Sequence, residues 1–160
     1  MNATNDAVQP GRTTLPAWGA DRLGAALSGR PDVSAAFGSA LTCDQATAVH
    51  ASLWEMGRGS TASVVRGEHH RRCGDLHDWR IERPLSWDLP EHAAQTVAHL
   101  MTLPGVVDTV ATAWLSPASE LELVLRALGC QDGADRWVSA CAAADEAWAH
   151  ATGIDIEETP

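Results

Sequence analysis

Histidine, cysteine and acidic residues that could bind a metal ion are concentrated in one short stretch of the sequence. Residues 68–78 read EHHRRCGDLHD, and within them His69, Cys73 and His77 are spaced four residues apart. On a continuous helix this spacing places all three side chains on one face. One thiolate, two imidazoles and a nearby carboxylate form a donor set that binds zinc in tetrahedral geometry. The stretch is therefore one candidate zinc site.

Two features of the same stretch favour a simpler interpretation. Gly74 lies between Cys73 and His77 and is expected to end the helix before the third donor. The sequence also lacks the paired CxxC or HxxxH motif of common zinc sites. We therefore interpret residues 68–78 as solvated surface. We expect no cofactor, and a fold that forms without metal or disulfides.

A second pattern combines the dipeptide His77-Asp78 with an earlier histidine and a later aspartate. This pattern resembles the HD phosphohydrolases, in which such residues lie on helices around a divalent metal. The residues that the resemblance would make metal ligands are His50, His77, Asp78 and Asp108. It implies that the metal polarises a phosphate and activates water. A metal-dependent phosphohydrolase is therefore one alternative function.

Other enzyme motifs are absent from the sequence, which contains no GxSxG, no GxxxxGK[ST] and no GxGxxG after a strand. The four cysteines, Cys43, Cys73, Cys130 and Cys141, are widely separated and form no CxxC. We interpret them as reduced thiols that behave as small buried hydrophobic residues. The sequence therefore favours a protein that is not an enzyme.

The charge of the chain limits its partners. Its 160 residues carry 11 basic and 21 acidic side chains, a formal net charge of −10, and every basic residue is an arginine. Binding to duplex DNA through its phosphates needs a basic stripe, so nucleic acid is not the favoured partner. The local exception is residues 60–72, the second helix of a predicted hairpin, where Arg66, Arg71 and Arg72 could contact DNA in a helix-turn-helix. A DNA-binding regulator is kept as a further alternative.

The elements that must position these residues are helices. Apolar residues make up 45% of the chain and recur at helical spacing. We predict an all-α protein, a compact bundle of six or seven short helices with an irregular segment around residues 74–89. The expected parts are a disordered lead at 1–13, one helical domain at 14–152 and an acidic tail at 153–160. Within the domain, residues 14–73 and 90–152 form the helical parts and 74–89 a packed loop.

Several local signals mark the predicted helix ends. Thr42 and Gln45 have the spacing of a capping box, and Ser60 is expected to cap the next helix. Ser116-Pro117 is expected to start a later helix with the proline in its first position. On the last helix, Trp148 is expected on the buried face.

The leading interpretation is a small acidic interaction or regulatory module that binds another protein. Tryptophan is enriched among interface anchors, and Trp79 and Trp87 in the irregular segment are the predicted partner contacts. No apolar run is long enough for a membrane span and no secretory signal is present, so we expect a cytoplasmic protein without membrane contact. Residues 41–69 are similar to short proteins of high-GC actinobacteria and their mobile elements or phages, a resemblance that implies no activity. The sequence leaves the oligomeric state open.

Overall fold

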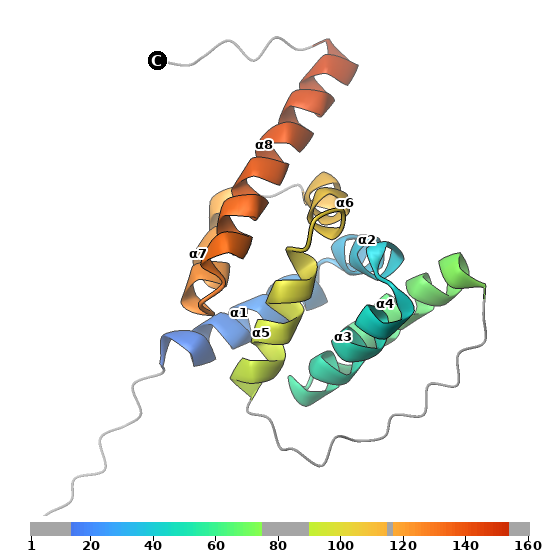
Figure 1. Cartoon of the computed structure of the whole chain (residues 1–160), viewed down its shortest axis with the longest axis vertical. Coiled ribbons are helices and arrows are strands. Elements are labelled where there is room, and N and C mark those ends of the chain that lie inside the picture. Colours follow the sequence, from blue (N-terminus) through green and yellow to red (C-terminus); the bar gives the residue numbers. More distant parts are fainter. Residues whose placement is uncertain (1–13, 75–89, 115–116, 154–160) are drawn as a thin grey trace, which may run out of the picture.

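The computed structural model describes residues 14–74, 90–114 and 117–153, and within these ranges the chain forms helices and no strands (Figure 1). The eight helices are α1 (Leu15–Gly29), α2 (Pro31–Ala40), α3 (Cys43–Glu55), α4 (Gly59–Cys73), α5 (Pro90–Met101), α6 (Val106–Ala113), α7 (Ala118–Ala127) and α8 (Gln131–Thr152). This confirms the all-α class, with one helix more than the upper number predicted. The predicted lead at 1–13, most of the loop at 74–89 and the tail beyond 153 lie outside the described residues. In the described part of the chain, no helix is both long and apolar enough to cross a membrane.

Several helix boundaries follow from the local signals in the sequence. The capping box is present, because the Thr42 hydroxyl accepts from the Gln45 N–H and the Gln45 side chain accepts from the Thr42 N–H. Gly74 ends α4 in the left-handed conformation, with φ 71°. Arg126 pairs with Glu122 one turn earlier on α7, as their spacing predicts.

Two predicted helix starts are wrong by one or two residues. α4 begins at Gly59 with Arg58 as its N-cap, and Ser60 is already helical. The Arg58 carbonyl accepts from the Ala62 N–H, so helical hydrogen bonding begins one residue after the turn at Gly57. Pro117 is the N-cap of α7 and not its first helical residue, because its ψ of 133° is extended.

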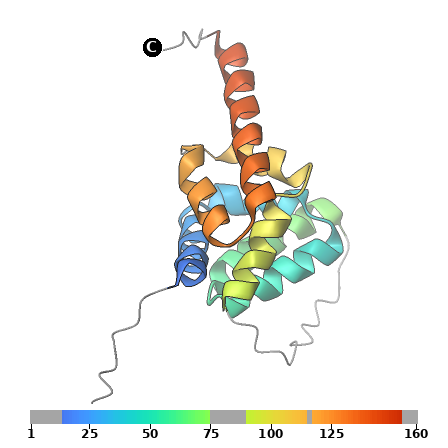
Figure 2. The same ribbon diagram turned by 60° about the vertical axis from the view of Figure 1, so that its left-hand side comes forward.

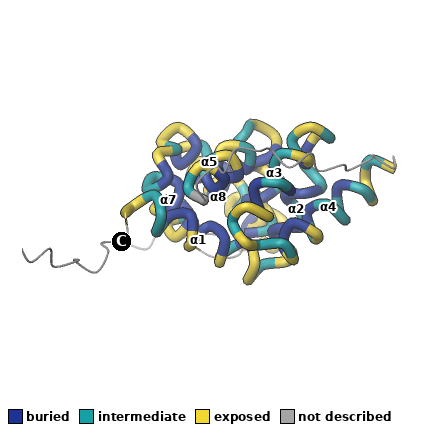
Figure 3. The backbone as a smooth tube through the Cα atoms, turned by 90° about the horizontal axis from the view of Figure 1, so that it is seen from below, coloured by how far each residue is buried: buried dark blue, intermediate teal, exposed yellow. Residues whose placement is uncertain are grey.

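The helices pack around one continuous hydrophobic core. α2 and α3 pack on α4, α3 and α1 pack on α5, and α7 and α6 pack on α8. Side chains with no exposed surface include Leu23, Phe37, Leu53, Leu125 and Trp137. Figure 3 shows buried residues along helices in every part of the bundle. Burial of this many apolar side chains is the main stabilising contribution to the fold.

α2 and α4 approach each other more closely than side chains would allow. Gly38 of α2 lies against the backbone of α4, and a Cβ added there would be 2.3 Å from the Val65 carbonyl oxygen. Glycine is required at this position because any side chain would push the two helices apart. Arg72 near the end of α4 also donates to the Ser39 carbonyl of α2. These contacts fix the position of α4 relative to α2.

The second half of α8 extends beyond the rest of the bundle (Figures 1 and 2). Trp137 and Cys141 are buried, as predicted for this face of the helix. Trp148, which was predicted on the same buried face, is 60% exposed, so that prediction is wrong. The reason is length: α8 has 22 residues, whereas α6 and α7, which pack on it, have 8 and 10.

Candidate metal centre

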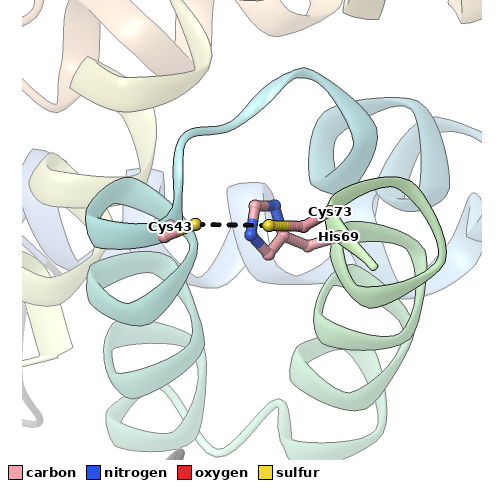
Figure 4. Close-up of side chains that lie close together, drawn as sticks. All are labelled: Cys43, His69 and Cys73. Atoms are coloured by element: carbon pink, nitrogen blue, oxygen red, sulfur yellow. Dashed lines mark hydrogen bonds between the residues drawn. The ribbon is translucent and has the colours of Figure 1, made fainter. Parts of the chain in front are cut away.

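The candidate site lies at the open end of the hairpin formed by α3 and α4. A short turn joins the two helices, so they run side by side in opposite directions (Figure 4). The first residue of α3 is Cys43 and the last residue of α4 is Cys73. An antiparallel hairpin with helices of 13 and 15 residues brings these two positions together. The fold therefore joins two cysteines that are thirty residues apart in the sequence.

Three metal-binding side chains meet at this point. Figure 4 shows Cys43 of α3 and His69 and Cys73 of α4 pointing into the space between the two helices. The two Sγ atoms are 3.5 Å apart, and one ligand atom from each residue lies within 4.8 Å of the others. Among residues 14–74, 90–114 and 117–153, this is the one group of three such donors.

The donor spacing matches what tetrahedral zinc requires. With Zn–S bonds of about 2.3 Å, two thiolates on one tetrahedral ion lie about 3.8 Å apart. The sulfurs of Cys43 and Cys73 are already within a few tenths of an ångström of that separation. The residues present therefore fit a zinc ion with two sulfur ligands and one nitrogen ligand. Three protein ligands leave the fourth position open to water or another ligand.

Local structure holds each ligand in place. The capping box at Thr42 and Gln45 fixes the first turn of α3, where Cys43 lies. His69 and Cys73 are four residues apart on α4, so their side chains share one face. His69 is only 3% exposed, and both cysteines are partly buried. The partial positive charge at the start of α3 would stabilise a negatively charged sulfur at Cys43.

The structure brings together two of the residues that the sequence singled out and adds one that it missed. His69 and Cys73 share a face, as their spacing predicts, and Gly74 ends the helix there. His77, Asp78 and the predicted partner contacts Trp79 and Trp87 lie outside the described residues. The missed ligand is Cys43, which the sequence analysis treated as a small hydrophobic residue. Its signal was the near-equal distance of the two cysteines from Gly57.

The other two residues of the HD-like pattern lie on helices that do not pack together. His50 is 2% exposed in α3, which packs on α4 and α5, and its Nε2 accepts a hydrogen bond from the Trp54 indole. Asp108 is exposed on α6, which packs mainly on α2 and α8. The described residues therefore give His50 a place in the hairpin interior and Asp108 a place on the surface.

Burial of His50 gives a testable dependence of stability on pH. Loss of hydration lowers the pKa of His50 below its ordinary value, and the charge of Arg66 lowers it further. In the unfolded chain the imidazole takes up a proton near pH 6.5, whereas the folded chain resists it. The contribution of His50 to stability is therefore present above about pH 6.5 and is lost as the pH falls below that value.

We expect the free energy of unfolding of the wild type to fall, relative to that of His50→Gln, between pH 7.5 and 5.5. Urea unfolding at several pH values measures this difference, with the exposed His150→Gln as the control substitution. A constant difference between wild type and His50→Gln across this range would contradict the assignment.

The arginines proposed for a helix-turn-helix are engaged within the protein. Arg71 pairs with Glu68 on the same helix, and Arg72 donates to the Ser39 carbonyl. α3 and α4 lie side by side, whereas the two helices of a DNA-binding helix-turn-helix cross steeply. A scan of protein-family models and searches of curated proteins and solved structures gave no significant match for this chain. The functional assignment therefore rests on the residues and their geometry.

Proposed function

We propose that this chain is a zinc-binding helical protein in which one ion held by Cys43, His69 and Cys73 joins the start of α3 to the end of α4. The observation that carries the proposal is the convergence of the three donors, with the two sulfurs 3.5 Å apart. Two thiolates and an imidazole are soft and borderline ligands, a combination that favours zinc over magnesium or calcium.

The position of the ligands indicates what the ion does. The two cysteines lie at the open end of the hairpin, opposite the turn at Gly57. A bound ion closes the hairpin there, so that both ends of the α3–α4 pair are held. The fold has a large core of its own, so zinc adds stability to a protein that is already folded.

Metal analysis of the purified protein tests this proposal. After zinc loading and gel filtration, we expect about one zinc per chain by mass spectrometry. Cys43→Ser and Cys73→Ser should each lower zinc affinity by about 100-fold or more, because removing a ligand costs more than disturbing a residue behind it. Cys130→Ala and Cys141→Ala should keep wild-type zinc binding. A wild-type protein that retains no zinc, or variants that all retain it, would contradict the proposal.

A second candidate function is the binding of another protein through the second half of α8. The observation that favours it is Trp148, which is 60% exposed on the part of the helix that extends beyond the bundle (Figure 2). Exposed tryptophans are frequent anchors at protein interfaces. A pull-down from the native host, with the wild type and Trp148→Ala as baits, tests it. A protein retained by the wild type and lost with the variant supports this function, and identical sets contradict it.

A further inference from the structure

The two cysteines of the candidate metal centre are also close enough to react with each other. Their sulfurs are 3.5 Å apart, and a disulfide requires about 2.05 Å. The remaining approach of about 1.5 Å is small and occurs between the first residue of α3 and the last residue of α4. Helix ends move more easily than helix centres, because they make fewer helical hydrogen bonds.

The other two cysteines lie in surroundings that suppress such a reaction. Cys141 is buried, and loss of hydration with the charge of Asp145 raises the pKa of its thiol to about 11. Burial also raises the pKa of the Cys130 thiol. The thiolate is the reactive form of cysteine, so both residues are poor nucleophiles near neutral pH. Cys43 and Cys73, in contrast, are partly exposed and adjacent.

We propose that Cys43 and Cys73 form a redox-sensitive site, at which a hydroperoxide converts the two zinc ligands to a disulfide and the ion is released. The loss of zinc rests on the proposed function, whereas the formation of the disulfide depends only on the two cysteines. The disulfide would close the hairpin covalently at the point where zinc closes it in the reduced protein.

The reaction balances with hydrogen peroxide as the oxidant. One thiolate attacks a peroxide oxygen, the O–O bond breaks, and a sulfenic acid and hydroxide form. The second thiolate attacks the sulfenic sulfur, the S–S bond forms, and a second hydroxide leaves. Two protons from solvent convert the hydroxides to water. The sulfur pair loses two electrons and the peroxide gains them, while zinc loses two of its three protein ligands.

The test treats the full-length, zinc-loaded protein with hydrogen peroxide and follows two quantities in parallel. Peptide mass spectrometry without reduction identifies the partner of each cysteine, and a chromophoric chelator measures released zinc. We expect one Cys43–Cys73 disulfide per chain, release of about one equivalent of zinc, and reversal of both by dithiothreitol followed by zinc. Cys43→Ser should form no intramolecular disulfide, and the Cys130→Ala/Cys141→Ala variant should behave as the wild type.

The outcomes separate this inference from the proposed function. If zinc is bound but the two cysteines stay unmodified, or oxidise only to sulfinic acids, the redox inference is overturned and zinc binding stands. Pairing of either cysteine with Cys130 or Cys141 also overturns it. If no zinc is bound but the Cys43–Cys73 disulfide forms, the redox pair is supported and the zinc proposal fails.

Discussion

Gly38→Ala is expected to lower the free energy of unfolding by about 3 kcal/mol, near the upper end of the usual cost of overpacking. An added Cβ would be 2.3 Å from the Val65 carbonyl oxygen and 3.0 Å from the Val65 Cα and carbonyl carbon. These are backbone atoms, so the clash can be relieved only by moving α2 away from α4. Urea unfolding followed by circular dichroism measures the effect.

The same pair of helices offers a matched control. Gly67 lies within α4, its φ is not positive, and a Cβ added there would meet no heavy atom within 4 Å. Gly67→Ala is therefore expected to leave stability unchanged or to raise it by up to about 1 kcal/mol through helix propensity. If Gly38→Ala proved as stable as Gly67→Ala, the close packing of α2 on α4 would be wrong.

Removal of zinc is expected to lower the melting temperature without unfolding the protein at 25 °C. Free zinc at 100 times its dissociation constant stabilises the folded state by about 2.7 kcal/mol. For a chain of this size that corresponds to about 5–10 °C in the melting temperature. Calorimetry with excess zinc and then with a chelator measures the shift, and Cys43→Ser/Cys73→Ser should show none.

Two results would contradict this expectation. A wild-type melting temperature that is the same with zinc and with chelator would show that the ion does not bind the folded hairpin. Complete unfolding on chelation at 25 °C would show that the core does not sustain the fold, although side chains such as Leu23, Phe37 and Trp137 have no exposed surface.

Most helix boundaries could be predicted because they depend on residues within one turn of each other. Thr42 and Gln45 satisfy each other's backbone and side-chain groups locally, and Gly74 adopts a left-handed conformation that other residues avoid. The i, i+4 relation of His69 and Cys73 is equally local. These features need no knowledge of the rest of the fold, so the sequence alone determined them.

The complete ligand set could not be predicted in the same way because Cys43 reaches it through tertiary structure. Its contact with Cys73 depends on the turn at Gly57, which folds two helices of similar length back on each other. The two cysteines lie 14 residues before and 16 residues after Gly57, so the hairpin itself contained the missing signal. Periodicity within one helix gives no information on which residue of another helix it meets.

The position of Trp148 was wrong for a related reason. Its spacing from Trp137 and Cys141 places it on the same face of α8, and the face is buried only where other helices cover it. The 3.6-residue period reports which side chains share a face and says nothing of where the neighbouring helices end. α6 and α7 are too short to cover the last turns of α8.

X-ray absorption at the zinc edge of the zinc-loaded protein tests the central claim most directly, because it reports the atoms bound to the ion. The structure predicts two sulfur ligands at about 2.3 Å and one imidazole nitrogen at about 2.0 Å, from Cys43, Cys73 and His69. Replacing Cys43 with serine should remove one of the two sulfurs. A shell of nitrogen and oxygen atoms alone would show that zinc binds elsewhere and would contradict the assignment of this hairpin as a metal centre.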